Sequence, residues 1–160
     1  MENITIRKAN LADLKSIQNF NYELCLKENK EYDQTINTDY PFTKEGENYF
    51  KSRIESDNSL VLIAKKDEKV AGYFIGSIIT NEDYRTITSI AEAENMYIDE
   101  NSRKQGIGSK LIQQFESWCN DKKIQTIRFV ASAKNIEAIE FYKKRGAEEI
   151  NITLEKTLIK

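Results

Sequence analysis

Residues 91–111, AEAENMYIDENSRKQGIGSKL, decide how the rest of the chain is interpreted. The segment starts with an alternation of apolar and polar residues that is typical of a strand, with Met96 and Ile98 on one side. A polar turn containing Gly106 and Gly108 follows, and a helical apolar periodicity begins within that turn. The stretch therefore predicts a strand, a loop and a helix in immediate succession.

The glycine turn is a candidate anion site. Glycine lets the backbone approach a ligand closely, and the N–H groups of such a turn can converge at the positive end of the following helix. Arg103, Lys104 and Lys110 add formal positive charge around that point. If the turn binds a ligand, a phosphate or diphosphate is favoured. An equally open alternative is that the glycines only permit tight packing between the strand and the helix. The glycine spacing matches neither the G-x-G-x-x-G dinucleotide loop nor the G-x-x-x-x-G-K-[ST] nucleotide loop.

Two motifs in order resemble the signatures of the GNAT superfamily of acyl-CoA-dependent N-acyltransferases. The run from Arg103 to Gly108 is similar to the Q/R-x-x-G-x-G/A loop of that family, with Lys104 at a place where glycine is common. The run from Asn135 to Gly146 is similar to the N-x-x-A-x-x-F/L-Y-x-x-x-G motif. The resemblance implies that acetyl-CoA is the cosubstrate and that the loop's amides hold its diphosphate. The residues that we expect to bind it are Met96, Ile98, Arg103, Lys104, Gln105, Gly106, Ile107, Gly108, Ser109, Lys110, Asn135 and Tyr142.

Composition bounds the remaining possibilities. A chain of 160 residues suits one domain spanning residues 1–160, and a net charge of −2 with a pI near 5.4 argues against nucleic acid as a partner. No window approaches the ~18 apolar residues of a membrane span, so we expect a cytoplasmic protein without a membrane partner. Cys25 and Cys119 lie in apolar stripes and are expected to be buried, reduced thiols. The absence of histidine excludes Ser-His-Asp mechanisms and most zinc sites, and no metal is expected.

The periodicity along the chain predicts the order β-α-α-β-β-β-α-β-α-β. The predicted strands are residues 3–8, 60–64, 70–79, 86–98, 125–131 and 150–158, and the predicted helices start near residues 10, 43, 107 and 135. This order implies an α/β (α+β) fold with a mixed, mostly antiparallel sheet and helices on its faces. The GNAT resemblance implies a central sheet of about six to seven strands flanked by about four helices.

Acyl transfer to an amine requires a proton acceptor, because an amine with a pKa near ~10 arrives protonated. Strand alternation places Glu92 and Glu94 on the face of Met96 and Ile98, unless a bulge intervenes. The residues just before the glycine turn resemble the corresponding GNAT pattern, in which the glutamate that some members use as base aligns with Glu94. Glu92 is the alternative base, and a purely structural carboxylate at position 94 is equally open.

The remaining catalytic parts follow from the same comparison with the family. The resemblance implies that Tyr142 lies beside the coenzyme sulfur, where it donates a proton or a strong hydrogen bond to the departing thiolate. A backbone N–H near Met96 or Tyr97 is the expected donor to the negative oxygen of the tetrahedral intermediate. The predicted catalytic side chains are therefore Glu94 and Tyr142.

The acceptor is expected to bind near the polar segment of residues 29–42. Candidate contacts there are Tyr32, Asp33, Asp39 and Tyr40, although an ordinary solvated connection is the more common role of such residues. The predicted activity is direct N-acetyl transfer in a ternary complex, with a small-molecule amine favoured over a protein N-terminus or lysine. Alternatives are a non-catalytic acyl-CoA-binding or regulatory domain and an ATP-binding protein. A homodimer is compatible with such a fold, but no exposed apolar stripe argues for it.

Overall fold

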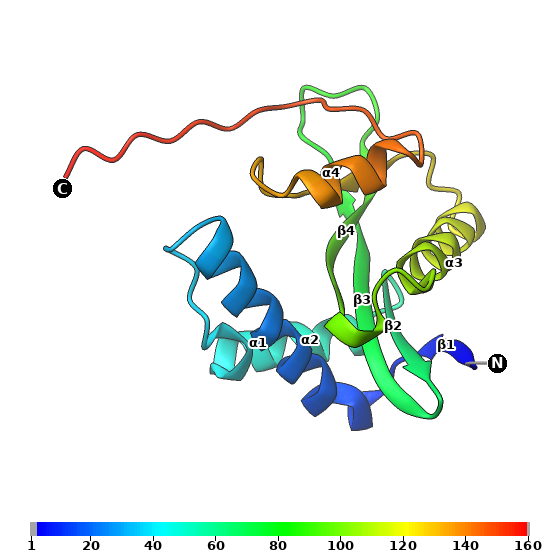
Figure 1. Cartoon of the computed structure of the whole chain (residues 1–160). Helices are drawn as coiled ribbons and strands as arrows, with labels where there is room; N and C mark the ends of the chain where they lie inside the picture. The colour runs from blue at the N-terminus through cyan, green and yellow to red at the C-terminus, as the bar shows by residue number, and fades with distance from the viewer. Residues whose placement is uncertain (1–2, 160) are drawn as a thin grey trace. The chain divides into compact units, whose positions relative to one another are not determined.

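A computed structural model of the protein describes residues 3–159, so the expected domain of residues 1–160 has its terminal residues 1, 2 and 160 outside that range (Figure 1). The chain divides into two compact units, the first reaching to Val130 and the second starting at Ala131. The elements of the first unit are β1 (Ile4–Lys8), α1 (Leu14–Glu31), α2 (Lys44–Glu55), β2 (Ser59–Lys66), β3 (Lys69–Thr80), β4 (Ser89–Ile98), α3 (Ile107–Asp121) and β5 (Ile127–Phe129). Short 3-10 turns are η1 (Leu11–Asp13), η2 (Tyr40–Phe42) and η3 (Glu100–Ser102).

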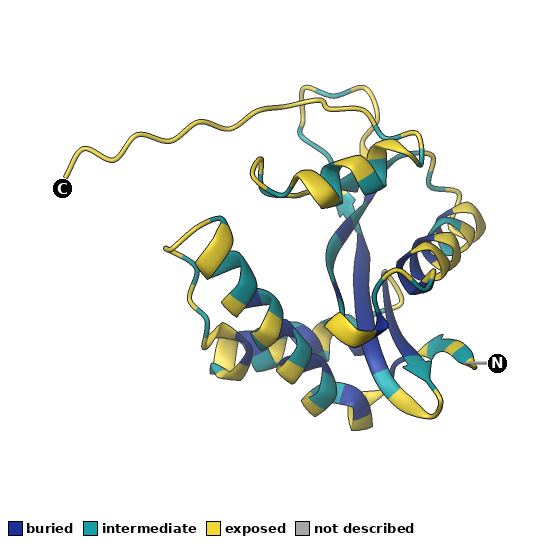
Figure 2. Cartoon of the chain, viewed as in Figure 1, coloured by how far each residue is buried: buried dark blue, intermediate teal, exposed yellow. Residues whose placement is uncertain are grey.

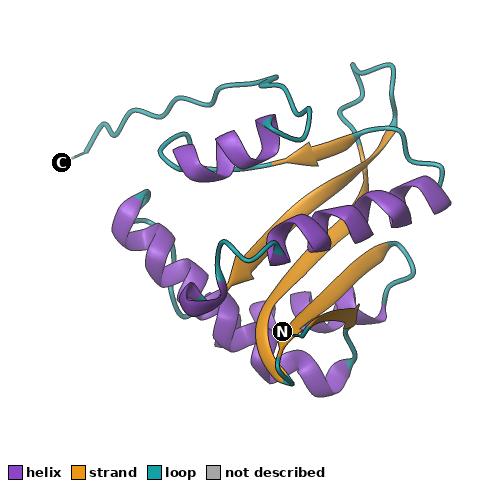
Figure 3. Cartoon of the chain, turned by 45° about the vertical axis from the view of Figure 1, so that its right-hand side comes forward, coloured by secondary structure: helices purple, strands orange, loops and turns teal. Residues whose placement is uncertain are grey.

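One sheet with the strand order β1-β2-β3-β4-β5 forms the centre of the first unit. The first four strands are antiparallel, and β5 runs parallel to β4, so the sheet is mixed as predicted. α1 and α2 cover one face, where Phe20 of α1 meets Tyr97 of β4, and α3 covers the other, where Phe115 packs on Phe74 (Figure 3). The interior strands are the most buried part of the unit (Figure 2).

Side-chain caps start α2 and η1, the turn that leads directly into α1, where the sequence predicts helix starts. Asn10 accepts a hydrogen bond from the N–H of Ala12, and Asp13 completes the capping box by accepting one from the N–H of Asn10. Arg7 of β1 holds the Asp13 carboxylate through two further hydrogen bonds of 2.7 and 2.8 Å. Thr43 caps α2 by accepting a 3.1 Å hydrogen bond from Gly46. The helix starts are therefore fixed by local chemistry.

A bulge in β4 reverses the direction predicted for Glu94. The pairing with β3 passes from Asn95 opposite Ile75 to Ala93 opposite Gly76, which leaves Glu94 as an extra residue. Its side chain consequently points to the face covered by α2, where it bonds residues of that helix. The bulge that the prediction excepted is present, so neither Glu92 nor Glu94 shares a face with Met96 and Ile98, because an unpaired residue interrupts the alternation.

The predicted strand at residues 150–158 is not formed, and the sheet has five strands, slightly below the predicted six to seven. Ile152 and Leu154 are 82% and 89% exposed, and between residues 148 and 159 no backbone hydrogen bond is formed to any described residue. Alternation gives such a segment one apolar face. A strand also needs a neighbour that completes the hydrogen-bond ladder and covers that face.

The second unit contains one helix, α4 (Ile136–Lys143). Asn135 caps it by accepting a 3.1 Å hydrogen bond from the N–H of Ala138. Gly146 ends the following turn with a φ of 88°, a left-handed conformation that glycine adopts without strain. No helix in the described part of the chain is long and apolar enough to span a membrane.

Candidate active site

The loop between β4 and α3 leaves its backbone donors unused. Consecutive N–H groups there donate no hydrogen bond to any residue in the range 3–159, namely those of Lys104, Gln105, Gly106, Ile107 and Gly108. The loop turns through the left-handed region at Lys104 and again at Gly106, with φ values of 60° and 81°. The first helical turn of α3 adds its positive dipole end to these donors. The loop therefore suits an anionic group such as a diphosphate.

Arg103 and Gln105 hold the shape of this loop. Arg103 donates from Nε to the carbonyl of Ile98 at 2.9 Å and lies over the ring of Tyr97, 5.2 Å from its centre. The Gln105 side chain donates to the carbonyl of Asn101 at 3.3 Å. Both side chains tie the loop to the segment that precedes it, so the backbone amides carry the anion-binding geometry.

β4 presents a free edge directly before the loop. On one side it pairs with β3 as far as Ile98, whereas β5 pairs with it only between Ala91 and Ala93. Residues 94–98 have no strand partner on the β5 side within the described chain. An extended ligand arm can pair with such an edge as an added strand would. The edge and the unused amides together form a continuous backbone surface for an extended anionic ligand.

Glu94 lies in a saturated hydrogen-bond network. Arg53 of α2 donates from Nε to both carboxylate oxygens, at 2.9 and 3.0 Å. The hydroxyls of Tyr49 and Ser77 donate to one oxygen each. The Glu94 side chain is 10% exposed, and this polar environment differs from the apolar one expected from the strand pattern. Burial, and secondarily the charge of Glu94, raise the pKa of the Tyr49 phenol, which therefore stays a hydrogen-bond donor.

Glu92 is the other carboxylate on this face of the sheet. It is the cross-strand partner of Ser77, whose hydroxyl reaches Glu94, so both carboxylates face α2. No hydrogen bond reaches the Glu92 carboxylate from residues 3–159, and Arg128 Nη1 lies 3.9 Å from it. Partial burial is the largest cause of the raised pKa of Glu92, and the charge of Glu94 adds to it. Glu92 thus keeps a free proton-accepting oxygen.

The model of the acetyltransferase (GNAT) family matches residues 22–147 of this sequence, which is most of the chain. This chain belongs to the GNAT family. The family is one of acetyltransferases, and acetyl-CoA is its cosubstrate. The unused amides are thus the candidate site for the coenzyme diphosphate in this GNAT protein.

Individual proteins resemble this chain in part of its sequence or in its fold. The chain is 33% identical over 69 residues to the uncharacterized protein YxbD of Bacillus subtilis (strain 168), a segment that covers 41% of this chain and only 43% of that relative. It is similar in structure to the tetramutant of the BH1408 protein from Bacillus halodurans, with a TM-score of 0.84, 19% identity and coverage of 96% and 99% of the two chains. It is also similar to AAC(6')-Iy, solved in complex with the bisubstrate analog CoA-S-monomethyl-acetylneamine, with a TM-score of 0.73, 14% identity and coverage of 98% and 99%. At these identities the solved structures show a shared fold.

The second unit of the GNAT chain carries the predicted Tyr142 and Asn135. Tyr142 stacks edge-on against Phe141, with ring centres 5.3 Å apart, and burial raises the pKa of its phenol. Asn135 serves as the helix cap described above. The proton-donating role of Tyr142 stays a prediction.

The predicted acceptor residues lie at the end of α1 and in the segment that follows. Asp33 accepts hydrogen bonds from the backbone N–H and the hydroxyl of Thr35, at 2.9 and 2.7 Å, so its carboxylate stabilises a local turn. Tyr32 ends α1, and Tyr40, 37% exposed, begins η2. A contact of these side chains with an acceptor stays a prediction.

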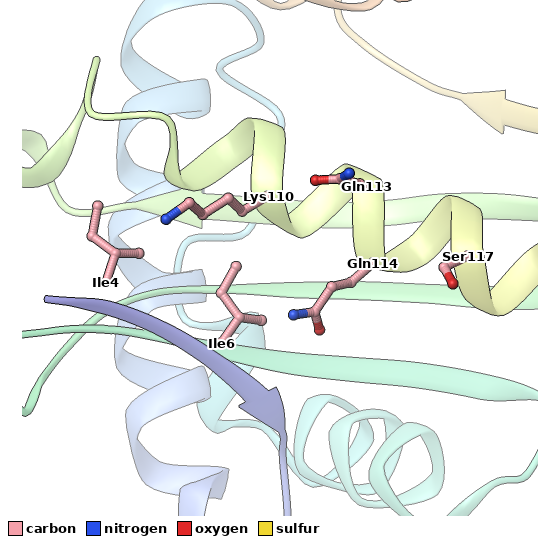
Figure 4. A pocket seen from close by; sticks show the side chains of 6 residues that line it. All are labelled: Ile4, Ile6, Lys110, Gln113, Gln114 and Ser117. Carbon is pink, nitrogen blue, oxygen red and sulfur yellow. The ribbon is translucent and has the colours of Figure 1, made fainter.

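Lys110 lies in the first turn of α3, and its contact with an anion at the loop stays a prediction. Its side chain reaches over β1 and lines a groove of about 480 Å³ between that strand and α3 (Figure 4). The other lining residues are Ile4, Ile6, Gln113, Gln114 and Ser117. Ser109, beside Lys110, is exposed in the first turn of α3. No group of three or more His, Cys, Asp or Glu side chains that could hold a metal ion occurs in the described sequence.

Sequence reasoning missed the partners of the two carboxylates. Tyr49 and Arg53 are four residues apart on α2, a spacing that places both on one helix face. An arginine one helical turn after an aromatic residue on the same face was the available signal. Ser77, Asn95 and Arg128 carried no comparable signal, because only strand pairing brings them to the site.

Proposed function

We propose that this GNAT protein transfers the acetyl group of acetyl-CoA directly to a primary amine of a small molecule, within a ternary complex. The observation that carries the proposal is the row of unused loop amides that continues the free edge of β4. The amides would bind the diphosphate, and the edge would bind the extended arm that carries the thioester. The thioester would then lie beside β4, on which both candidate bases are located.

Glu92 is the better proton acceptor of the two strand carboxylates. Both oxygens of Glu94 already accept hydrogen bonds, so a proton taken there would displace Arg53, Tyr49 or Ser77. The Glu92 carboxylate has no such donor among the described residues, and its raised pKa brings it nearer to the operating pH. We therefore assign the base to Glu92, directly or through water, and an electrostatic role to Glu94.

The remaining steps use the backbone and Tyr142. The neutral amine attacks the thioester carbonyl, forming the C–N bond, while an N–H near Met96 or Tyr97 stabilises the negative oxygen. Collapse breaks the C–S bond, and the thiolate takes a proton or a strong hydrogen bond from Tyr142. The ammonium substrate loses one proton to the base before attack and a second after it, so the products are the amide, free coenzyme A and a proton.

A small, cationic amine is the acceptor class that we favour. AAC(6')-Iy was solved with an analog that joins coenzyme A to an aminoglycoside-derived amine, which supports an acceptor of that size. Carboxylates on and near β4, including Glu82 and Glu92, would attract a protonated amine. Tyr32, Asp33 and Tyr40 are the proposed acceptor contacts.

The test is acetyl-CoA turnover with a panel of small amines, followed as release of free thiol. Activity with at least one amine, together with stabilisation by coenzyme A in a melting assay and none by ATP, supports the proposal. Stabilisation by coenzyme A without turnover would indicate a non-catalytic acyl-CoA-binding domain.

Matched variants separate the two carboxylates. Glu92→Gln should lower kcat/KM about 100-fold or more near neutral pH, the usual contribution of a general base, with unchanged affinity for acetyl-CoA. Glu94→Gln should retain much more activity than Glu92→Gln. The opposite order would return the base to Glu94.

A further inference from the structure

A buried polar network connects α1, α2, β3 and β4 and ends at Glu94. Asn21 donates to the Tyr73 hydroxyl at 2.8 Å, and that hydroxyl donates to Asn95 at 2.9 Å. Asn95 in turn donates to the Tyr49 hydroxyl at 3.0 Å, and Tyr49 donates to Glu94. A fully satisfied chain of this kind fixes the position of every member, because an unpaired buried polar group is costly.

The network ends in an ion pair between Arg53 and Glu94. Burial opposes the charge of Arg53, but the hydrogen bond and charge of Glu94 outweigh it and raise the pKa of the guanidinium. Arg53 is 32% exposed and also lies over the ring of Tyr49, 5.0 Å from its centre. The Arg53–Glu94 pair therefore places a positive and a negative charge on the face of the sheet that carries Glu92.

Glu92 faces charges from every element around it. Arg128 of β5 lies 3.9 Å away and also bonds Glu82, in the loop after β3, at 2.9 Å. Glu94 of β4 and Arg53 of α2 also act on it, and Tyr49 of α2 stays neutral. Glu94 and Glu82 disfavour ionisation of Glu92, whereas Arg128 and Arg53 favour it. Burial and Arg128 act on the pKa of Glu92 more strongly than this pair does, and Arg53 offsets part of the effect of Glu94.

We propose that the Arg53–Glu94 ion pair, on the face of the sheet that also carries Glu92, adjusts the pH above which Glu92 accepts the proton of the amine. The inference rests on the proposed function, because it gives Glu92 the role of base. Arg53 and Glu94 are then positioning residues that act through Glu92. A pair in which both charges are present holds Glu92 between the two extremes that either charge alone would create.

The sign of each substitution follows from Coulomb's law. Arg53→Met removes a positive charge and leaves Glu94 uncompensated, so Glu92 protonates more readily and the acidic limb of kcat/KM moves to higher pH. Glu94→Gln leaves Arg53 uncompensated, so the limb moves to lower pH. We expect about half to one pH unit for Glu94→Gln, the size of a partly screened single charge, and a smaller shift of opposite sign for Arg53→Met, because Arg53 acts on Glu92 more weakly than Glu94 does. The double variant should return the limb close to that of the unmodified protein.

The experiment measures the acidic limb for the unmodified protein, both single variants and the double variant. Carbon-13 NMR of the glutamate side-chain carboxyls, assigned with Glu92→Gln, follows the titration of Glu92 without any substrate. Arg53→Lys is the conservative control, because it keeps the positive charge and should restore the limb even if the hydrogen bonds are weaker.

The outcomes are distinct. The proposal is supported if the acidic limb of kcat/KM lies at lower pH in Glu94→Gln than in Arg53→Met, and if the NMR titration of Glu92 shows the same order. Limbs and titrations that coincide, or that shift in the same direction in both variants, would overturn it, since general damage to the fold cannot produce opposite signs. If the NMR titrations separate but the rates do not follow, the electrostatic coupling exists and the assignment of Glu92 as base in the proposed function is what fails.

Discussion

Gly76 of β3 lies opposite the bulge that turns Glu94, and its replacement by alanine should destabilise the protein measurably. An added Cβ would lie 2.4 Å from Cε2 of Phe115 on α3. Ordinary carbon–carbon contacts lie at about 3.5–4.0 Å, so the ring would have to withdraw by about 1 Å. Phe115 is fully buried and packs between Phe74 and Trp118, at centroid distances of 4.8 and 5.8 Å. The ring therefore has no open space into which it can move.

Two opposing contributions determine how much Gly76→Ala changes the free energy of unfolding. Overpacking of a filled core costs about 1–3 kcal/mol, and loss of glycine flexibility in the unfolded chain returns about 0.4–1 kcal/mol. Gly76→Ala should thus lower the free energy of unfolding by about 1–2 kcal/mol, which corresponds to a decrease in Tm of about 2–8 °C for a domain of this size.

The assay is urea unfolding followed by circular dichroism, with Phe115→Leu as the compensating change. If the clash is the cause, the double variant should be more stable than the sum of the single effects predicts, by about 0.5 kcal/mol or more. Gly72→Ala is the matched control, since its Cβ would meet the backbone carbonyl oxygen of Tyr97 at 2.5 Å, where no side-chain truncation can relieve it. Unchanged stability of Gly76→Ala, or strict additivity with Phe115→Leu, would refute the packing argument.

Four further outcomes are expected. Asp13→Asn should cost about 1 kcal/mol of stability at neutral pH, as lost helix caps do. Because hydrogen bonds from Arg7 hold the pKa of Asp13 below its usual range, that cost should vanish as pH falls through this lowered pKa; an equal Tm difference at acid and neutral pH would contradict it. Gly106→Ala, at a φ of 81° with open space around it, should strain the loop by about 1–2 kcal/mol and raise KM for acetyl-CoA more than it lowers Tm, as checked by kinetics and melting. Tyr142→Phe should lower kcat with little change in KM for the amine, and an unaltered kcat would remove its proposed role. Burial raises the pKa of both thiols to about 11, so Cys25 and Cys119 should react with a disulfide reagent only slowly until the chain is unfolded in urea, and rapid labelling of the native protein would contradict their burial.

The helix starts, the glycine loop and the family could be predicted from the sequence, because each depends on interactions within a few residues. Asn10 with Asp13, and Thr43, mark helix starts because a capping side chain must stand at a defined distance from the donors that it satisfies. The loop around Gly106 was predictable for the same reason, since a chain that turns through positive φ selects glycine. The family followed from two such local motifs in the correct order.

The tertiary structure alone decided the arrangement of the carboxylates. Strand periodicity predicts alternating faces, but the extra residue at Glu94 exists only because β3 and β4 pair in a register shifted at Gly76, and no local pattern states that register. The choice between Glu92 and Glu94 likewise depends on Arg53 and Tyr49, which come from a helix about 40 positions earlier in the chain. Local propensity fixes which residues form helices, strands and turns, because those energies arise within a few residues. Which carboxylate keeps a free oxygen depends on contacts between segments far apart in the sequence, and these exist only after folding.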